Sequence, residues 1–204
     1  MQVCLLNPWS MSNKTTAIHD FILDHNIDVL CITETLLTGN ENDNPVISAV
    51  LPPGYSMQHV DRIGAKGGGC AIIHQSGIQT KPSTEAHEFS TFECCDYTFM
   101  AAHPIRIIVV YRPPNNSHLP MSQFFDEFAS LLEAVSIQGG HTLVLGDMNF
   151  HVNDHADSNA RKLLEMLDSM NMKQHVTKSS HRSGNILDLV ITRDSDTLVQ
   201  SAVP

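Results

Sequence analysis

A carboxylate and a carboxamide lie two residues apart in Gly146-Asp147-Met148-Asn149, directly after the apolar run Thr142-Leu143-Val144-Leu145. Alternate residues of a strand share a face, so both side chains can point at one bound group. An aspartate supplies charge for a metal ion or acts as a base, and an asparagine donates to one oxygen while accepting from another. The pair suits the handling of a phosphate and an attacking water. A Gly-Asp pair after a strand is also common as a plain turn, so the motif alone leaves both interpretations open.

Three further apolar segments carry polar side chains of the same kind. They are residues 27–35, which contain Glu34 near their end, residues 106–114, which contain Tyr111 and Arg112, and residues 186–192, which Asp188 interrupts. Strand ends that share one edge of a sheet converge in space, although they are far apart in sequence. Buried carboxylates are costly unless they meet a cation or hydrogen-bond donors. We therefore expect these carboxylates to form one shared site.

These motifs, with Asn7 before them, resemble the motif order of the endonuclease/exonuclease/phosphatase superfamily. The matching segments are Thr33-Glu34-Thr35, Tyr111-Arg112-Pro113-Pro114, Gly146-Asp147-Met148-Asn149 and Leu187-Asp188-Leu189-Val190-Ile191-Thr192. The second and fourth segments are similar to the endonuclease domain of non-LTR (LINE-type) retrotransposons, particularly those of vertebrate genomes. The resemblance spans nearly the whole chain. It implies one α/β domain over residues 1–204, folded as a four-layer α/β/β/α sandwich of the DNase I-like type.

The resemblance implies a metal site and a base. Glu34 is expected to be the principal ligand of Mg²⁺, or of Mn²⁺ in its place, with Asn7 in the metal and phosphate shell. Asp147 is expected to orient or deprotonate the attacking water. A hard cation prefers oxygen ligands and neutralises the charge of the pentavalent transition state, which is the chemistry that this residue set suits.

The resemblance also implies a set of phosphate-binding groups. Asn149 is expected to hydrogen-bond the scissile phosphate, and Tyr111 to donate its hydroxyl to a phosphate oxygen. Asp188 is expected to hold a histidine that completes this set. Neutral donors of this kind stabilise negative charge that appears only during the reaction.

The chain departs from the family pattern at three motifs. It contains no Ser-Asp-His, the family's last motif, and stops at Ser201-Ala202-Val203-Pro204, so we expect a C-terminally truncated domain that lacks its last strand. The usual Asn-x-Arg-Ser reads Asn7-Pro8-Trp9-Ser10, and the usual Glu-Thr-Trp-Leu reads Glu34-Thr35-Leu36-Leu37. We expect Trp9, the only tryptophan, to pack against the first helix. The missing histidine leaves it open whether the chain is a working enzyme.

Composition and charge restrict the possible partners. The chain has 12 Lys plus Arg against 22 Asp plus Glu, a formal net charge of −10, whereas binding to polyanions relies on basic patches and released counterions. We therefore expect weak DNA binding by this domain alone. The resemblance to retroelement endonucleases implies a tethered downstream reverse transcriptase, which would compensate through effective concentration. No segment approaches the roughly 20 apolar residues of a membrane span, and no signal peptide is evident. Five cysteines without C-x-x-C spacing are expected to be reduced, in an intracellular protein. The resemblance implies that this protein acts in the nucleus.

Hydrophobic periodicity predicts alternating strands and helices. Strands are expected at residues 2–6, 27–35, 55–60, 70–74, 89–97 and 105–111, and helices around residues 17–22 (capped at Ser12-Asn13), 123–135 and 159–170. Residues 61–69, with Gly67-Gly68-Gly69, are expected to form a mobile turn rather than a P-loop. His151 and His155 are expected at the surface of a loop rather than on zinc. No helix is expected between residues 55 and 111, which favours two facing sheets over a doubly wound parallel sheet.

Three hypotheses about function follow. The first is a Mg²⁺-dependent DNA endonuclease domain of a non-LTR retroelement, which makes the nick that primes reverse transcription. The second is a phosphatase or nuclease of the same superfamily that acts on other phosphoesters. The third is a catalytically dead fragment that at most binds metal or DNA. A plasmid-nicking assay separates the first from the third. We expect weak or absent nicking by residues 1–204, restored when the missing C-terminal strand and its histidine are appended.

Overall fold

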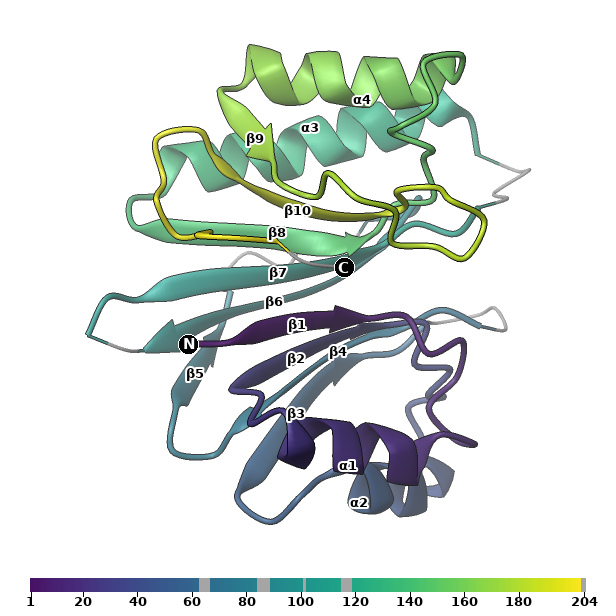
Figure 1. Cartoon of the computed structure of the whole chain (residues 1–204), viewed down its shortest axis with the longest axis vertical. Coiled ribbons are helices and arrows are strands. Elements are labelled where there is room, and N and C mark those ends of the chain that lie inside the picture. Colours follow the sequence, from purple (N-terminus) through teal and green to yellow (C-terminus); the bar gives the residue numbers. More distant parts are fainter. Residues whose placement is uncertain (63–66, 84–88, 101, 115–118, 203–204) are drawn as a thin grey trace.

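Two β-sheets pack face to face, and helices cover the outer face of each sheet (Figure 1). The computed structural model describes residues 1–62, 67–83, 89–100, 102–114 and 119–202. The chain therefore forms the four-layer α/β/β/α sandwich that the sequence predicts.

The first sheet contains four strands in the order β1-β2-β4-β3. Their bounds are Val3–Leu6 (β1), Val29–Thr33 (β2), Tyr55–Val60 (β3) and Cys70–Gln75 (β4). Strands β1 and β2 are parallel, and β4 is antiparallel to both of its neighbours. Helices α1 (Thr15–Asp24) and α2 (Asn44–Val50), with the 3-10 turn η1 (Glu41–Asp43), lie on its outer side (Figure 1). Apolar side chains such as Ile18, Ile22 and Val50 seal that layer.

The second sheet contains six strands in the order β5-β6-β7-β8-β10-β9. Their bounds are Gln79–Pro82 (β5), Glu93–Met100 (β6), Ile105–Tyr111 (β7), His141–Asp147 (β8), Met172–Gln174 (β9) and Asp188–Arg193 (β10). Only β7 and β8 pair in parallel, and helix α3 (Met121–Ile137) connects them. Helix α3 and helix α4 (Ser158–Ser169) cover this sheet from outside (Figure 1). Phe124 and Phe128 of α3 anchor the cluster beneath them.

The central strands are buried on both faces, which is why they read as continuous apolar runs. In β7, Ile107, Val109 and Tyr111 face the other sheet. The alternate residues Ile108 and Val110 face helix α3. In β7 the residues from Ile107 to Val110 are all apolar, so its buried polar side chains, Arg106 and Tyr111, lie toward its two ends.

The element boundaries agree with the sequence in most places. The helices predicted at residues 123–135 and 159–170 are α3 and α4, and the predicted antiparallel pair is β3 and β4. The predicted cap of the first helix is wrong, because α1 begins at Thr15 and Lys14 precedes it without a capping side chain. The strand predicted from residue 89 begins later, at Glu93, and the short elements α2, β5 and β9 were not predicted.

The cysteines act as small apolar residues. All five are free, and Cys31, Cys70 and Cys95 are fully buried between the sheets. Burial raises the pKa of the Cys70 thiol well above its ordinary value, so this thiol stays protonated and packs as a hydrophobe. In the described part of the chain, no helix combines the length and apolarity required to cross a membrane.

The closest backbone contact in the fold predicts a strict requirement for glycine. Gly146 of β8 pairs with Val110 of β7, and a Cβ atom on Gly146 would overlap the Val110 carbonyl oxygen. We expect Gly146→Ala to lower the free energy of unfolding by about 3 kcal/mol or more, because β7 and β8 would have to separate. Gly77→Ala is the control, since a Cβ there meets nothing within 4 Å. Urea unfolding measures both, and equal stability of the two variants would contradict the close approach.

Candidate active site

Four polar side chains form a row across one edge of the second sheet. Glu93 pairs with Tyr111, Tyr111 pairs with Asp147, and Asp147 pairs with Asp188, across strands β6, β7, β8 and β10. Residues paired directly across strands share a face. Tyr111 belongs to the core between the sheets, so the row faces the first sheet.

The first sheet contributes two further residues that sequence analysis selected. Asn7 follows β1 and Glu34 follows β2. The Asn7 side-chain nitrogen donates to a Glu34 carboxylate oxygen at 3.1 Å and to an Asp147 carboxylate oxygen at 2.7 Å. The Asn7 side-chain oxygen accepts from the Trp9 backbone nitrogen at 2.9 Å, which orients the amide with its nitrogen toward the two carboxylates. One amide therefore joins carboxylates that come from the two sheets.

The backbone around Glu34 and Trp9 is held in an unusual conformation. Glu34, Trp9 and Ser10 have positive φ angles of 52°, 50° and 99°, which non-glycine residues rarely adopt. The Ser10 nitrogen donates to the Glu34 carbonyl at 3.0 Å, and the Met11 nitrogen donates to the Thr35 carbonyl at 3.1 Å. Backbone strain of this kind is concentrated at functional sites, where the surrounding structure has to maintain it.

The sequence predicted that Trp9 packs against the first helix, but the structure exposes it. Its side chain is 73% exposed. The physical reason is the positive φ at Trp9 and Ser10, which turns the chain so that the buried neighbours are Pro8 and Met11 instead.

Burial and neighbouring charges act together on Asp147. Burial and the nearby carboxylate of Asp188 raise the pKa of Asp147 to about 6, and Glu34 adds to this effect. Hydrogen bonds from Asn7 and from the Asn149 backbone oppose it. The site thus concentrates negative charge that a cation would neutralise.

Tyr111 lies in the same electrostatic environment. Burial raises the pKa of its hydroxyl, and the charge of Glu34 together with a hydrogen bond to Glu34 raises that pKa further. The phenol is therefore a protonated donor at every physiological pH. This state is the one required for donation to a phosphate oxygen.

Asp188 retains an oxygen that lacks a donor. Burial raises the pKa of Asp188, whereas the Ser180 hydroxyl and the charge of His181 lower it. Its Oδ1 atom is buried, and none of the described residues donates a hydrogen bond to it. An uncompensated buried acceptor is costly, so this oxygen is poised to accept a donor such as an imidazole.

Asn149 lies next to Asp147 at the edge of the site, but the two residues do not share a strand face as predicted. Strand β8 ends at Asp147, and Asn149 has a positive φ of 50°, so the two do not lie on one face of a strand. Instead, the Asn149 backbone nitrogen donates to the Asp147 carboxylate at 3.0 Å. The Asn149 side chain donates to the Arg112 carbonyl at 2.8 Å, which leaves its second N–H and its oxygen for a ligand.

Arg112 supports this loop, a role that sequence analysis missed. Its guanidinium is 5% exposed and donates to the carbonyls of Met148 at 2.6 Å and Asn149 at 2.7 Å. It also lies 4.0 Å from the ring centre of Phe150. The sequence showed an arginine at the end of an apolar strand, but nothing in it indicated where the side chain would turn.

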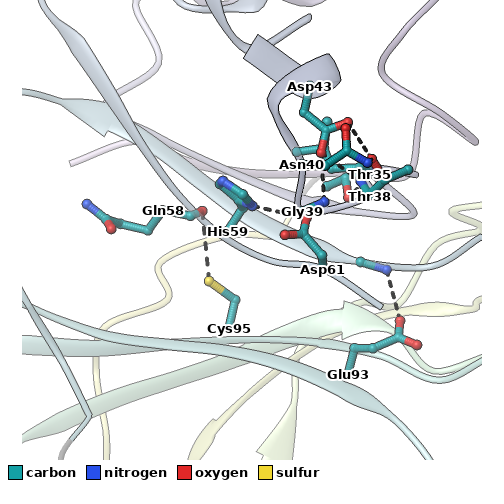
Figure 2. Close-up of polar contacts among 12 residues, drawn as sticks. Thr35, Thr38, Gly39, Asn40, Asp43, Gln58, His59, Asp61, Glu93 and Cys95 are labelled. Atoms are coloured by element: carbon teal, nitrogen blue, oxygen red, sulfur yellow. Dashed lines mark hydrogen bonds and ion pairs between the residues drawn. The ribbon is translucent and has the colours of Figure 1, made fainter. Parts of the chain in front are cut away.

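Glu93 supports the opposite loop and was also missed. It forms an ion pair with Arg62 at 3.0 Å. It also accepts from the Gly69 nitrogen at 3.1 Å (Figure 2 labels Glu93). Gly68 packs so closely against Glu93 that a Cβ on Gly68 would lie 2.6 Å from the carboxylate. The Gly68 carbonyl in turn accepts from Leu36 at 2.9 Å. The two described glycines nearest β4 thus brace the segment that follows Glu34.

A second acidic cluster nearby has a structural role. Asp43 accepts from the backbone nitrogens of Thr38 at 2.7 Å and Gly39 at 2.8 Å, and His59 bonds to Asp61 at 3.1 Å (Figure 2). Burial alone would raise the pKa of Asp43, but these hydrogen bonds lower it below its ordinary value. The carboxylate is therefore satisfied by its own loop, which leaves no oxygen that demands a ligand.

The donor set at the site fits an open magnesium site. Across the described ranges, no three His, Cys, Asp or Glu side chains are grouped as a closed metal cage. Mg²⁺ is usually held by one or two carboxylates, with water and substrate phosphate as its other ligands. Glu34 supplies such a carboxylate and Asn7 supplies an amide oxygen if its side chain reorients. Burial is the main cause of the raised pKa of Asp147, and the carboxylates of Asp188 and Glu34 raise it further, which is the part that a cation would offset.

Known proteins share this fold over most of its length. The model of a family described as "Endonuclease/Exonuclease/phosphatase family" matches residues 1–204. The APE2 catalytic domain of Xenopus laevis has 16% identity and a TM-score of 0.68, with 95% of this chain and 82% of that chain covered. The 3′ phosphatase NExo of Neisseria, bound to a product DNA hairpin, has 16% identity and a TM-score of 0.64, covering 94% and 86%.

A sugar-phosphate phosphatase is similar as well. The mannosyl-6-phosphatase of Bacteroides thetaiotaomicron has 13% identity and a TM-score of 0.63, with 92% of this chain and 78% of that chain covered. No curated protein matches the sequence. Enzymes with this family's fold generally depend on a divalent metal, commonly Mg²⁺.

The raised pKa of Asp147 predicts how stability depends on pH in metal-free solution. Its folded pKa of about 6 lies above the ordinary value of 3.8, so this carboxyl stabilises the fold at low pH. That contribution is lost as the pH rises through about 6. Relative to Asp147→Asn, which cannot ionise, the parent chain should lose on the order of 2 kcal/mol between pH 4 and pH 7. Urea unfolding in EDTA measures the difference, and parallel pH profiles would contradict it.

The contacts of Arg112 predict that its loss disturbs the loop between Asp147 and Phe150. We expect Arg112→Ala to lower the free energy of unfolding by about 3 kcal/mol, because two buried carbonyls lose their donors. Arg112→Lys should restore only part of this, since an ammonium cannot span both carbonyls. The exposed Arg161 of α4 provides the control, with a change within about 0.5 kcal/mol. Thermal or urea unfolding would disprove the role if Arg112→Ala behaved like Arg161→Ala.

Proposed function

Because the chain belongs to the endonuclease/exonuclease/phosphatase family, we propose that it hydrolyses phosphodiester bonds in DNA with Mg²⁺, or Mn²⁺ in its place. The observation that carries this proposal is the Asn7 amide, which bonds to both Glu34 and Asp147. Metal-assisted hydrolysis needs a ligand for the ion beside a base for water, and these two carboxylates lie on either side of one amide.

The proposed metal ligands are Glu34 and Asn7. Mg²⁺, when bound, supplies charge neutralisation at the scissile phosphate. Asp147 accepts the proton of the attacking water. A pKa of about 6 suits this role, because the carboxylate is ionised at neutral pH and is more basic than an ordinary aspartate.

The proposed phosphate donors are Tyr111 and Asn149. The raised pKa of Tyr111 keeps its hydroxyl protonated, and the hydroxyl can move its hydrogen bond from Glu34 to a phosphate oxygen. Asn149 offers the side-chain N–H that Arg112 does not use. Donors that are fixed before substrate arrives stabilise the charge of the transition state without reorganisation.

The substrate that we favour is DNA, in the setting of a non-LTR retroelement. Two sequence motifs that are similar to those of non-LTR retroelement endonucleases support this setting. They are Tyr111-Arg112-Pro113-Pro114 and Leu187-Asp188-Leu189-Val190-Ile191-Thr192. Similar folds in NExo, which is bound to a DNA hairpin, and in the APE2 catalytic domain support DNA as the substrate class. In this proposal, the domain makes the nick from which a downstream reverse transcriptase begins synthesis in the nucleus. Tethering to that polymerase offsets the weak affinity expected of an acidic domain.

One observation favours a second candidate, namely binding of metal or DNA without turnover. Residues 1–204 contain no Ser-Asp-His, and Asp188 Oδ1 has no donor among the described residues. His181 is the imidazole whose charge acts on Asp188, and its own Nδ1 atom bonds to Ser183 at 2.5 Å. Without an imidazole at Asp188, the phosphate-binding groups lack the histidine that the family pattern includes, and we expect binding without hydrolysis.

Nicking of supercoiled plasmid DNA tests the proposal. With Mg²⁺, we expect weak nicking by the chain, because the phosphate-binding set lacks its histidine. Asp147→Ala should nick about 100-fold more slowly or less, because a positioned base contributes at least that much. Asp168→Ala, an exposed residue of α4, serves as the control and should retain the parent rate. EDTA should abolish nicking. Nicking that Asp147→Ala leaves unchanged would refute the proposed site, and the absence of nicking by the parent chain would favour the second candidate.

A further inference from the structure

An exposed indole stands beside the proposed active site. Trp9 is the only tryptophan of the chain and is 73% exposed, although tryptophan side chains are on average highly buried. Its backbone nitrogen donates to the side-chain oxygen of Asn7 at 2.9 Å. The indole is therefore attached to the turn that orients the amide between Glu34 and Asp147.

This turn fixes the backbone of Trp9 and leaves its indole exposed. Trp9 and Ser10 both have positive φ, and the Ser10 nitrogen donates to the Glu34 carbonyl at 3.0 Å. The preceding Pro8 is buried, and its carbonyl accepts from the Lys14 ammonium. A backbone fixed from both sides places the attachment point of the indole next to the site, so only the side-chain torsions of Trp9 have to be ordered on binding.

The charge of the chain makes an uncharged contact valuable here. The formal net charge is −10, so counterion release contributes little to binding of a polyanion. Stacking of a base on an aromatic ring needs no basic patch, and every base offers a π-face. Lys14 adds one cation at the same turn, which suits the phosphate that connects such a base to the strand.

We infer that Trp9 is a stacking platform for an unpaired nucleobase of the DNA strand whose scissile phosphate lies at the site next to Asn7. The inference rests on the proposed function, since it identifies the substrate as DNA whose bases are accessible, such as a single-stranded or locally opened segment. A base inside an intact duplex has both faces covered by its neighbours and cannot use the indole in this way.

The intrinsic fluorescence of the chain tests this inference directly, because Trp9 is its only indole. The Asp147→Asn variant in Mg²⁺ prevents turnover during a titration with a short oligodeoxythymidylate. We expect saturable quenching by this probe, and little quenching by an abasic oligonucleotide of the same length and phosphate number. Equal quenching by both probes, or no binding of the oligodeoxythymidylate, would overturn the inference.

A matched pair of substitutions gives a second measurement. In the same background, Trp9→Ala should weaken binding of the labelled oligodeoxythymidylate by about 5- to 100-fold, and Trp9→Phe should weaken it less. Ile137→Ala is the control, because Ile137 is 86% exposed at the end of α3 and should not affect affinity. The factor by which Trp9→Ala weakens binding should change little with salt concentration. Unchanged affinity of Trp9→Ala contradicts the inference even when the parent chain nicks plasmid DNA, so the two proposals fail independently.

Discussion

One side-chain nitrogen, that of Asn7, lies between a carboxylate of each sheet and sets the geometry of the whole site. Glu34 and Asp147 would repel each other at this range without a donor or a cation between them. The arrangement requires that the parallel pairs β1-β2 and β7-β8 end at the same edge of the sandwich. It also requires the inter-sheet core to hold these ends at a fixed spacing. The site is therefore a property of the packed sandwich, since no single segment contains it.

The supports of the site come from residues that have no proposed contact with substrate. Arg112 fixes the loop after Asp147 through two backbone carbonyls, and Glu93 fixes the segment after Glu34 through Gly69. Both supports belong to the second sheet, so the loop after Asp147 and the segment after Glu34 are both tied to its strands. Strained backbone at Glu34 and a raised pKa at Asp147 show the cost of this preorganisation. A divalent cation would relieve the electrostatic part of that cost.

The sequence predicted the main strands and the polar residues at their ends, which depend on local pattern. It did not predict side-chain positions that depend on contacts between distant segments. The burial of β7 on both faces produced a run of apolar residues that was readable directly, and the polar groups that end such runs marked the site. Asn149 was expected on the strand face of Asp147, but a left-handed residue beyond the strand end places it differently. Trp9 was expected to pack against the first helix, whereas a turn fixed by Glu34, a residue distant in sequence, exposes it. The short edge strands β5 and β9 carry no periodicity that distinguishes them from loops.

Binding of a divalent cation at Glu34 is the claim on which the rest of the account depends. The most direct test is the electron paramagnetic resonance signal of free Mn²⁺, measured as the chain is titrated. The account predicts that the parent chain removes Mn²⁺ from solution and that Mg²⁺ displaces it. Glu34→Gln should abolish this binding. Glu41→Gln, in the separate acidic cavity lined by Asp43 and Asp61, should preserve it. Binding that survives Glu34→Gln but is lost in Glu41→Gln would contradict the account.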